Sequence, residues 1–279
     1  MVIDALLDAV FDSLRALPFL IAAFAVMELL EKHSDKYTDR LFLRFRKAGP
    51  VIGAVLGLFP QCGFSAAMSN LYAGSVITLG TLIAVFLSTS DEAVLIMLSS
   101  PESAVSIMPL LAVKLIIAVT AGFIVDAVFK GAGKEPDIEA ICTDCGCHEK
   151  KGLVIPVLIH TRNVMIWLLL ISFILNVLLE SVGSDQLAEL MGNDMLLQPL
   201  ITALVGLIPN CAVSVMFTKL YLAGTLSFAS TIAGLSSGAG IGLIVLFRMD
   251  KDKKEALKIV SVLYVCAAAA GIILRLLGI

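Results

Sequence analysis

The sequence predicts an all-α integral membrane protein built from two inverted-topology repeats, with broken or re-entrant helices that meet near the bilayer midplane. Three observations lead to this fold class. Of the 279 residues, 59% are hydrophobic and only 15% are charged, whereas soluble domains are roughly one-quarter charged. A motif containing proline and cysteine occurs twice, and the Lys and Arg residues favour opposite loops in the two copies. The composition excludes a large soluble catalytic domain.

Apolar segments follow the same order in both halves of the chain. A spanning helix needs about 20 apolar residues, and each half has two long apolar runs flanking one interrupted apolar region. The long runs are 14–30, 103–129, 153–179 and 259–277, and the interrupted regions are 51–98 and 200–247. We therefore divide the chain into a first repeat (1–130), a loop (131–152) and a second repeat (153–279).

Each interrupted region contains a proline followed by a polar residue and a cysteine. Residues 57–65, GLFPQCGFS, align with residues 206–214, GLIPNCAVS. Proline breaks helices, and unpaired backbone at membrane depth is tolerated where it faces protein or a wet cavity. The alternative is a pair of packed proline kinks. We expect a substrate site formed by Pro60, Gln61, Cys62, Ser65, Asn70, Pro209, Asn210, Cys211, Ser214 and Lys219.

A second polar interruption follows in each copy. Our alignment pairs Leu87-Ser88-Thr89-Ser90 with Leu235-Ser236-Ser237-Gly238. Asp91 and Glu92 come next in the first copy only, and a charge at that depth costs roughly 2.5 kcal/mol or more unless it is paired or hydrated. We expect both acids to take part in coupling, by ligating a cation or by exchanging a proton. The alternative is that they cap a half-helix.

Two lysines lie within apolar segments. Lys114 is in the middle of the run 103–129, and Lys219 stands where the first copy has Asn70. Buried acids and bases pair with one another when they can. We expect Lys114 to act with the acids in coupling, and Lys219 either to contribute to the site or to reach a membrane interface.

Basic residues orient the loops, because Lys and Arg favour the cytoplasmic side. They are frequent in 31–47 and absent from its counterpart 183–197, and frequent in the predicted loop 248–258 but absent from 99–106. Equivalent loops therefore lie on opposite sides, which places the central loop in the cytoplasm and both termini outside. The region 51–98 must then cross an odd number of times. One hairpin plus one crossing fits its length best, and three short crossings are the alternative.

The central loop carries the candidate metal site Cys142, Cys145, Cys147 and His148. Three thiols and an imidazole so close together suit Zn, Cu(I) or trivalent arsenic. The alternative is a loop with incidental cysteines. We expect no other cofactor.

The two Pro-x-Cys motifs, the Ser-Thr-Ser-Asp-Glu interruption and the Cys/His loop together resemble the ten-helix heavy-metal or arsenic efflux permeases of prokaryotes, a family also described as manganese transporters. The resemblance extends over essentially the whole chain. It implies a permease more firmly than it implies a substrate. Ten helices would give five to each repeat, which favours the alternative with three crossings.

We therefore expect a secondary active exporter of a heavy metal, metalloid or manganese ion in a prokaryotic cytoplasmic membrane. No G-x-x-x-x-G-K-[ST] motif occurs, so coupling to an ion gradient or a partner is expected. A proton-coupled transporter of a small anion is the alternative. A membrane-embedded enzyme is disfavoured, because H-E-x-x-H does not occur and an inverted duplication is typical of transporters. The expected partners are a small ion and the lipid bilayer, with no nucleic acid, and the oligomeric state stays open, a homodimer included.

Overall fold

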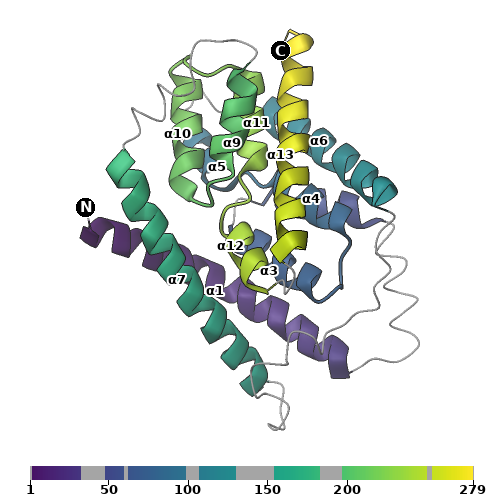
Figure 1. The fold of residues 1–279 in the computed structure, drawn as a ribbon, viewed down its shortest axis with the longest axis vertical. Helices are drawn as coiled ribbons and strands as arrows, with labels where there is room; N and C mark the ends of the chain where they lie inside the picture. Colours follow the sequence, from purple (N-terminus) through teal and green to yellow (C-terminus); the bar gives the residue numbers. More distant parts are fainter. Residues whose placement is uncertain are drawn as a thin grey trace.

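The fold is described from a computed structural model, which covers residues 2–32, 48–59, 62–98, 107–129, 154–182, 197–249 and 253–278. In these ranges all regular secondary structure is helical (Figure 1), which confirms the all-α prediction. The long helices are α1 (Val2–Lys32), α6 (Ile107–Val128), α7 (Val154–Val182) and α13 (Lys253–Leu276). The short helices are Ala48–Gly57, α3 (Cys62–Ala73), α4 (Leu79–Ser88), α5 (Asp91–Leu98), α9 (Gln198–Gly206), α10 (Cys211–Leu222), α11 (Phe228–Ser237) and α12 (Ile241–Met249).

The first short helix of each half packs beside the third and runs in the same direction. Gly49 lies against Thr81 of α4, and Gly57 lies against Ser88 at the end of α4. Because both helices point the same way, the chain must return through α3 before α4 begins. Ala48–Gly57 and α3 therefore form a helical hairpin, and α9 and α10 form its counterpart.

Each hairpin arm is too short to cross a bilayer. The arm α3 has 12 residues and α9 has 9, which corresponds to about 14–18 Å at 1.5 Å per residue, against a hydrocarbon core of about 30 Å. By contrast, α11 and α12 together make one apolar segment of spanning length, Phe228–Met249. One hairpin plus one interrupted crossing, rather than three crossings, therefore fits the described residues of each half.

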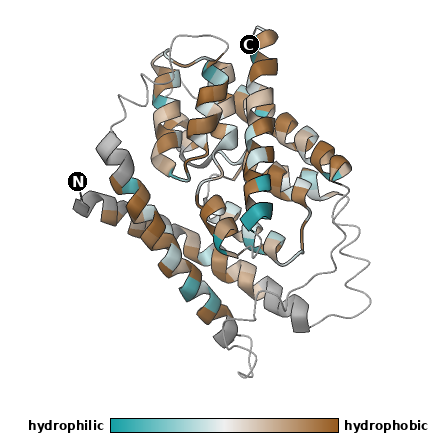
Figure 2. Cartoon of the chain, viewed as in Figure 1, coloured by the Kyte–Doolittle hydropathy of each residue, from teal (hydrophilic) through white to brown (hydrophobic). Residues whose placement is uncertain are grey.

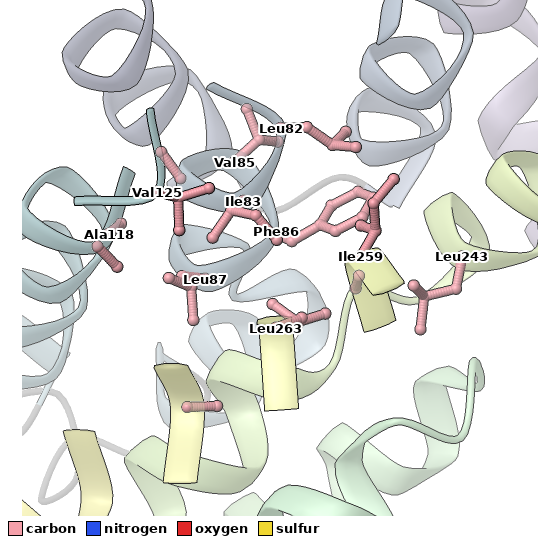
Figure 3. Close-up of a cluster of buried hydrophobic side chains, with 14 of the residues drawn as sticks. Leu82, Ile83, Val85, Phe86, Leu87, Ala118, Val125, Leu243, Ile259 and Leu263 are labelled. Carbon is pink, nitrogen blue, oxygen red and sulfur yellow. The ribbon is translucent and has the colours of Figure 1, made fainter. Parts of the chain in front are cut away.

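The central helices α4 and α11 are buried on nearly all sides, and the buried residues of α11 include Ser230, Thr231, Ser236 and Ser237. Figure 3 shows side chains of α4, α6, α12 and α13 meeting in this core, with Phe86 of α4 facing Ile259 and Leu243. In the segment Phe228–Met249, 89% of an apolar window of 18 residues is buried, whereas 28% of the corresponding window of α6 is buried. Figure 2 shows apolar residues along the outer helices α6, α7 and α13, as lipid contact requires.

The long helices α1 and α7 cross at one side of the molecule (Figure 1). There Ala16 and Leu20 of α1, with Val164 and Leu168 of α7, form a separate buried cluster together with residues of α3 and α12. This contact joins the first long helix of one half to the first long helix of the other. The predicted inversion of the two halves and their membrane orientation remain predictions.

The prediction of a loop over 248–258 is wrong. Helix α12 continues to Met249, and α13 already begins at Lys253. Lys254 and Lys258 are exposed, whereas Ile259 is fully buried, so the basic residues occupy the solvent face of the first turns of α13. A short run of charges is therefore compatible with an amphipathic helix start as well as with a loop.

The alignment of the second interruption is wrong by one residue. Gly57 lies against Ser88, and its counterpart Gly206 lies against Ser237, whereas the sequence alignment paired Ser88 with Ser236. The difference in residue number between equivalent positions of the two hairpins therefore stays the same through α4 and α11. Asp91 then corresponds to Gly240, so the acid still has no counterpart.

Candidate functional site

The tip of each hairpin lies beside the break that interrupts the crossing of its own half. A Cβ atom on Gly57 would meet Val85 and Ser88, and one on Gly206 would meet Gly234 and Ser237. Glycine at these two positions lets the end of the first arm approach the end of the central helix closely. The end of the first arm is therefore brought next to the end of α4, from which Thr89 and Ser90 lead to α5.

The second arm of each hairpin packs against the half-helix that follows the break of the other half. Ser69 of α3 donates a hydrogen bond to the Gly242 carbonyl of α12 at 2.8 Å, and a Cβ atom on Gly242 would lie 2.9 Å from Ser65 Oγ. Helix α10 likewise packs against α5. Both tips and both breaks are thereby drawn into one region, and we call this region the break site.

Lys114 joins the two halves at the break site. Its side chain is fully buried, and Nζ donates hydrogen bonds to the Thr89 carbonyl at 2.6 Å and the Leu235 carbonyl at 2.8 Å. Thr89 caps the C-terminus of α4, and Leu235 is in the last turn of α11. The partial negative charges at the C-termini of both central helices therefore face one ammonium group.

The second hairpin tip is held by asparagines. Asn210 caps α10, because its Oδ1 accepts a hydrogen bond from the Ala212 amide at 2.8 Å. Its Nδ2 donates to Asn176 Oδ1 of α7. Pro209 is half-buried, and Cys211, the first residue of α10, is a buried cysteine. Predicted residues of the second copy thus lie where a helix begins at the break site.

The first hairpin tip falls partly outside the described residues, because these omit Pro60, Gln61 and the side chain of Cys62, the first residue of α3. Ser65 is fully buried against α12. Asn70 is also fully buried, and within the described part of the chain neither its Nδ2 nor its Oδ1 has a hydrogen-bond partner. An unpartnered buried amide is costly, so Asn70 is the described polar side chain in most need of a partner.

Asp91 and Glu92 are the first two residues of α5, and their side chains are outside the described residues. Just before them, Ser90 Oγ donates to the Ser88 carbonyl at 3.1 Å, and Thr89 Oγ1 donates to the Val85 carbonyl at 2.7 Å. The hydroxyl groups of the break therefore satisfy carbonyls at the end of α4. The two acids follow directly, at a helix N-terminus that favours negative charge.

The remaining predicted residues do not join this region. Ser214 is half-buried one turn into α10, and Lys219 is exposed in its last turn, as expected if it reaches an interface. Cys142, Cys145, Cys147 and His148 fall outside the described residues, so a metal site there remains a prediction. Among the residues that the structure places, no three His, Cys, Asp or Glu side chains form a metal-binding group.

Sequence reasoning missed the residues that hold the hairpins in place. Asp126 accepts hydrogen bonds from Thr78 Oγ1 and the Gly80 amide, both at 2.8 Å, and so fixes the start of α4. In the second half, Gln198 Oε1 accepts from Ser230 Oγ at 2.8 Å. The glycines at 49, 53 and 57 were a signal in the sequence, because small residues four apart allow close helix packing.

The family described as "Putative, 10TM heavy-metal exporter" matches residues 1–186 and 173–278, which together cover nearly the whole chain. The chain belongs to this family. No curated protein and no solved structure matches it. Ten transmembrane segments, as in the family description, would give five crossings to each half, whereas the described residues of each half fit three crossings and a hairpin of two short arms.

Proposed function

We propose that the protein is a secondary active exporter of a heavy metal, metalloid or manganese ion in a prokaryotic cytoplasmic membrane. The family supports an exporter, and the bonds from Lys114 to one break in each half support a site between the halves. A site placed between two repeats can open to either side in turn when one repeat moves against the other. Because the breaks belong to different halves, such a movement changes the surroundings of both.

The proposed ligands lie where the second hairpin arms begin. Cys62 and Cys211 are the first residues of α3 and α10, and thiolates prefer soft ions such as trivalent arsenic or Cu(I). Manganese prefers oxygen ligands, which Ser65 and the carboxylates of the break site could supply. The substrate class therefore depends on whether the thiols or the oxygen ligands dominate.

Export from loaded membrane vesicles tests this assignment. We expect the double variant Cys62→Ser with Cys211→Ser to lose export of arsenite, because serine does not replace a thiolate for a soft ion. Cys266→Ser is the matched control, since Cys266 lies in α13 and outside the break site. Unchanged arsenite export in the double variant would remove the thiols from the site, and a loss of manganese export alone would favour the oxygen ligands.

We assign coupling to Asp91 and Glu92, which begin α5 beside the break. In the same vesicles, Asp91→Asn with Glu92→Gln should abolish the dependence of export on an imposed proton gradient. The helix-capping alternative predicts a less stable protein whose export still follows the gradient. Measuring both export and thermal stability separates the two roles.

A proton-coupled transporter of a small anion is the second candidate. It is favoured by one observation: α3, α5, α10 and α12 all begin at the break site, and helix N-termini attract anions. Labelling of the Cys211 thiol distinguishes the candidates. Protection by small anions such as carboxylates, with no protection by arsenite or metal ions, would replace the exporter of metals with an anion transporter.

A further inference from the structure

Two helix C-termini from different halves of the chain share a single cation. The carbonyls of Thr89 and Leu235 both accept hydrogen bonds from Lys114 Nζ. The amide that would close the next turn on Leu235 is that of Ala239, and it donates to the Ser237 carbonyl instead, at 3.0 Å. The break after α11 therefore releases the Leu235 carbonyl from its normal helical partner.

Free carbonyls at the end of a half-helix are suited to binding a small cation, because they carry partial negative charge and sit in a low-dielectric region. In transporters with broken helices, such carbonyls coordinate the coupling ion. Here the ammonium group of Lys114 is within hydrogen-bonding distance of carbonyls from both breaks. It reaches them from α6, whose position 114 is fully buried.

We propose that Lys114 is a tethered cation that fills a carbonyl site shared by the two breaks, so that no free monovalent cation is needed there, and that removal of its ammonium creates a binding site for a small cation such as Na⁺. The proposal deepens the proposed function, because it assigns the role of one group in coupling. The occupancy of the carbonyl site, however, can be measured without transport.

The second half supports a single shared cation. Gly122 of α6 lies against Gly80 of α4, and Gly271 of α13 lies against Ala229 of α11. The difference in residue number is the same between Gly80 and Ala229 as between Gly122 and Gly271. The same difference places Leu263 at the position equivalent to Lys114. Leu263 is fully buried in the apolar core, so the second half supplies a carbonyl to the site but no matching ammonium.

Thermal unfolding of the purified full-length protein in different salts tests the proposal. We expect the wild type to have the same unfolding midpoint in sodium, potassium and choline chloride. Lys114→Ala should have a lower midpoint in choline chloride, and Na⁺, K⁺ or methylammonium should raise it in a saturable way, because a small cation can enter the vacated space and choline is too large. Lys254→Ala, which removes an exposed lysine of α13, is the matched control and should show no cation dependence.

Lys114→Gln provides a second variant if Lys114→Ala does not fold, because it keeps a hydrogen-bond donor and removes the charge. It should also be stabilised by small cations, whereas Lys114→Arg should not. A midpoint of Lys114→Ala and Lys114→Gln that is insensitive to all three small cations would overturn the proposal, and so would equal stabilisation of the wild type by Na⁺.

Export assays separate this proposal from the proposed function. We expect replacement of Na⁺ by choline to leave wild-type export unchanged, and Lys114→Ala to lose export by about 10-fold or more when small cations are absent, as the loss of charged hydrogen bonds worth about 1.5–3 kcal/mol implies. If no metal or metalloid is exported at all, the proposed function fails while the cation-dependent midpoint still tests the tethered cation. Wild-type export that requires Na⁺ would contradict the proposal directly.

Discussion

In the first half of the chain, the start of the central helix α4 is fixed by the Asp126 carboxylate, which reaches it from the long helix α6. In the second half, the start of α11 is fixed by the neutral amide of Gln198, which belongs to the hairpin arm α9. The two central helices therefore occupy equivalent positions but are held by different elements and different chemistry. The common frame depends on helix packing, and the polar contacts are free to differ.

The opposite ends of the same helices differ in charge. Lys114 places an ammonium group between the two C-termini, whereas the equivalent Leu263 adds only apolar contact. Asp91 and Glu92 also occur in the first half alone. The first half thus carries the charges of the break site, and the second half carries the neutral counterpart of each. An exchange of substrate and coupling ion would then depend on the charges of one half.

Leu263→Lys is expected to have the largest effect, because it would give the second half the ammonium that the first half has. Leu263 is fully buried among apolar side chains of α4 and α13, and a charge placed there without partners should destabilise the fold by about 3 kcal/mol or more. Thermal unfolding measures this loss. Leu263→Met is the control and should cost less than about 1.5 kcal/mol. Equal stability of the two variants would show that the halves do not differ in this respect.

Gly57→Ala and Gly206→Ala test the feature that the halves share. A Cβ atom on Gly57 would lie 2.7 Å from the Val85 carbonyl oxygen, so one arm must move away from the central helix. We expect each variant to lower the free energy of unfolding by about 2 kcal/mol. Gly238→Ala is the control, because the nearest atom to its Cβ would be 3.5 Å away. A stable Gly57→Ala beside an unstable Gly206→Ala would show that only the second hairpin needs close packing.

Asp126→Ala and Gln198→Ala should differ in how much they lower the free energy of unfolding. The carboxylate of Asp126 accepts two hydrogen bonds at the N-terminus of α4, and its loss should cost about 1.5 kcal/mol. Loss of the neutral Gln198 amide should cost about 1 kcal/mol. Chemical unfolding of both variants gives the comparison, with Thr120→Ala on the exposed side of α6 as the control. A larger loss for Gln198→Ala would reverse the assignment of the stronger anchor to the first half.

The smallest expected effect concerns a contact between helices α7 and α12 of the second half. The Arg248 guanidinium lies 5.4 Å from the centre of the Trp167 ring, and such exposed cation–π contacts contribute about 0.5–1 kcal/mol. Arg248→Gln should lower stability by about that amount. Lys258, whose ammonium lies 4.1 Å from the centre of the Phe129 ring, offers a comparison with Lys258→Gln. Losses above 2 kcal/mol would mean that Arg248 does more than contact the ring.

Local signals predicted the helices and the positions of the breaks. The sequence motif placed the first interruption at Pro60 and Pro209, and the first arms do end at Gly57 and Gly206. Proline and small polar residues act on the backbone within a few residues, so their effect can be read from one stretch of sequence. The choice of a hairpin over three crossings needed the contact of Gly57 with α4.

The partners of Lys114 could not be predicted in the same way. The sequence showed a lysine inside an apolar helix and suggested acids as partners. Pairing with Asp91 or Glu92 stays a prediction, because their side chains are outside the described residues. One of the bonds of Lys114 reaches the Leu235 carbonyl, 121 residues away, and a backbone carbonyl carries no signature in the sequence. Lys114 was therefore recognised as unusual because it is a charged residue in an apolar segment. Its role at the break site was recognised from the tertiary structure.

The packing of α3 against α12 and of α10 against α5 has a consequence for biosynthesis. When the first half has entered the membrane and the second is still being translated, α3 lacks its contact with α12, and α5 lacks its contact with α10. The first hairpin can reach its final position only after the second half has been inserted. Separate expression of the two halves should therefore yield insertion without a stable core, and quality control should recognise the chain until translation is complete.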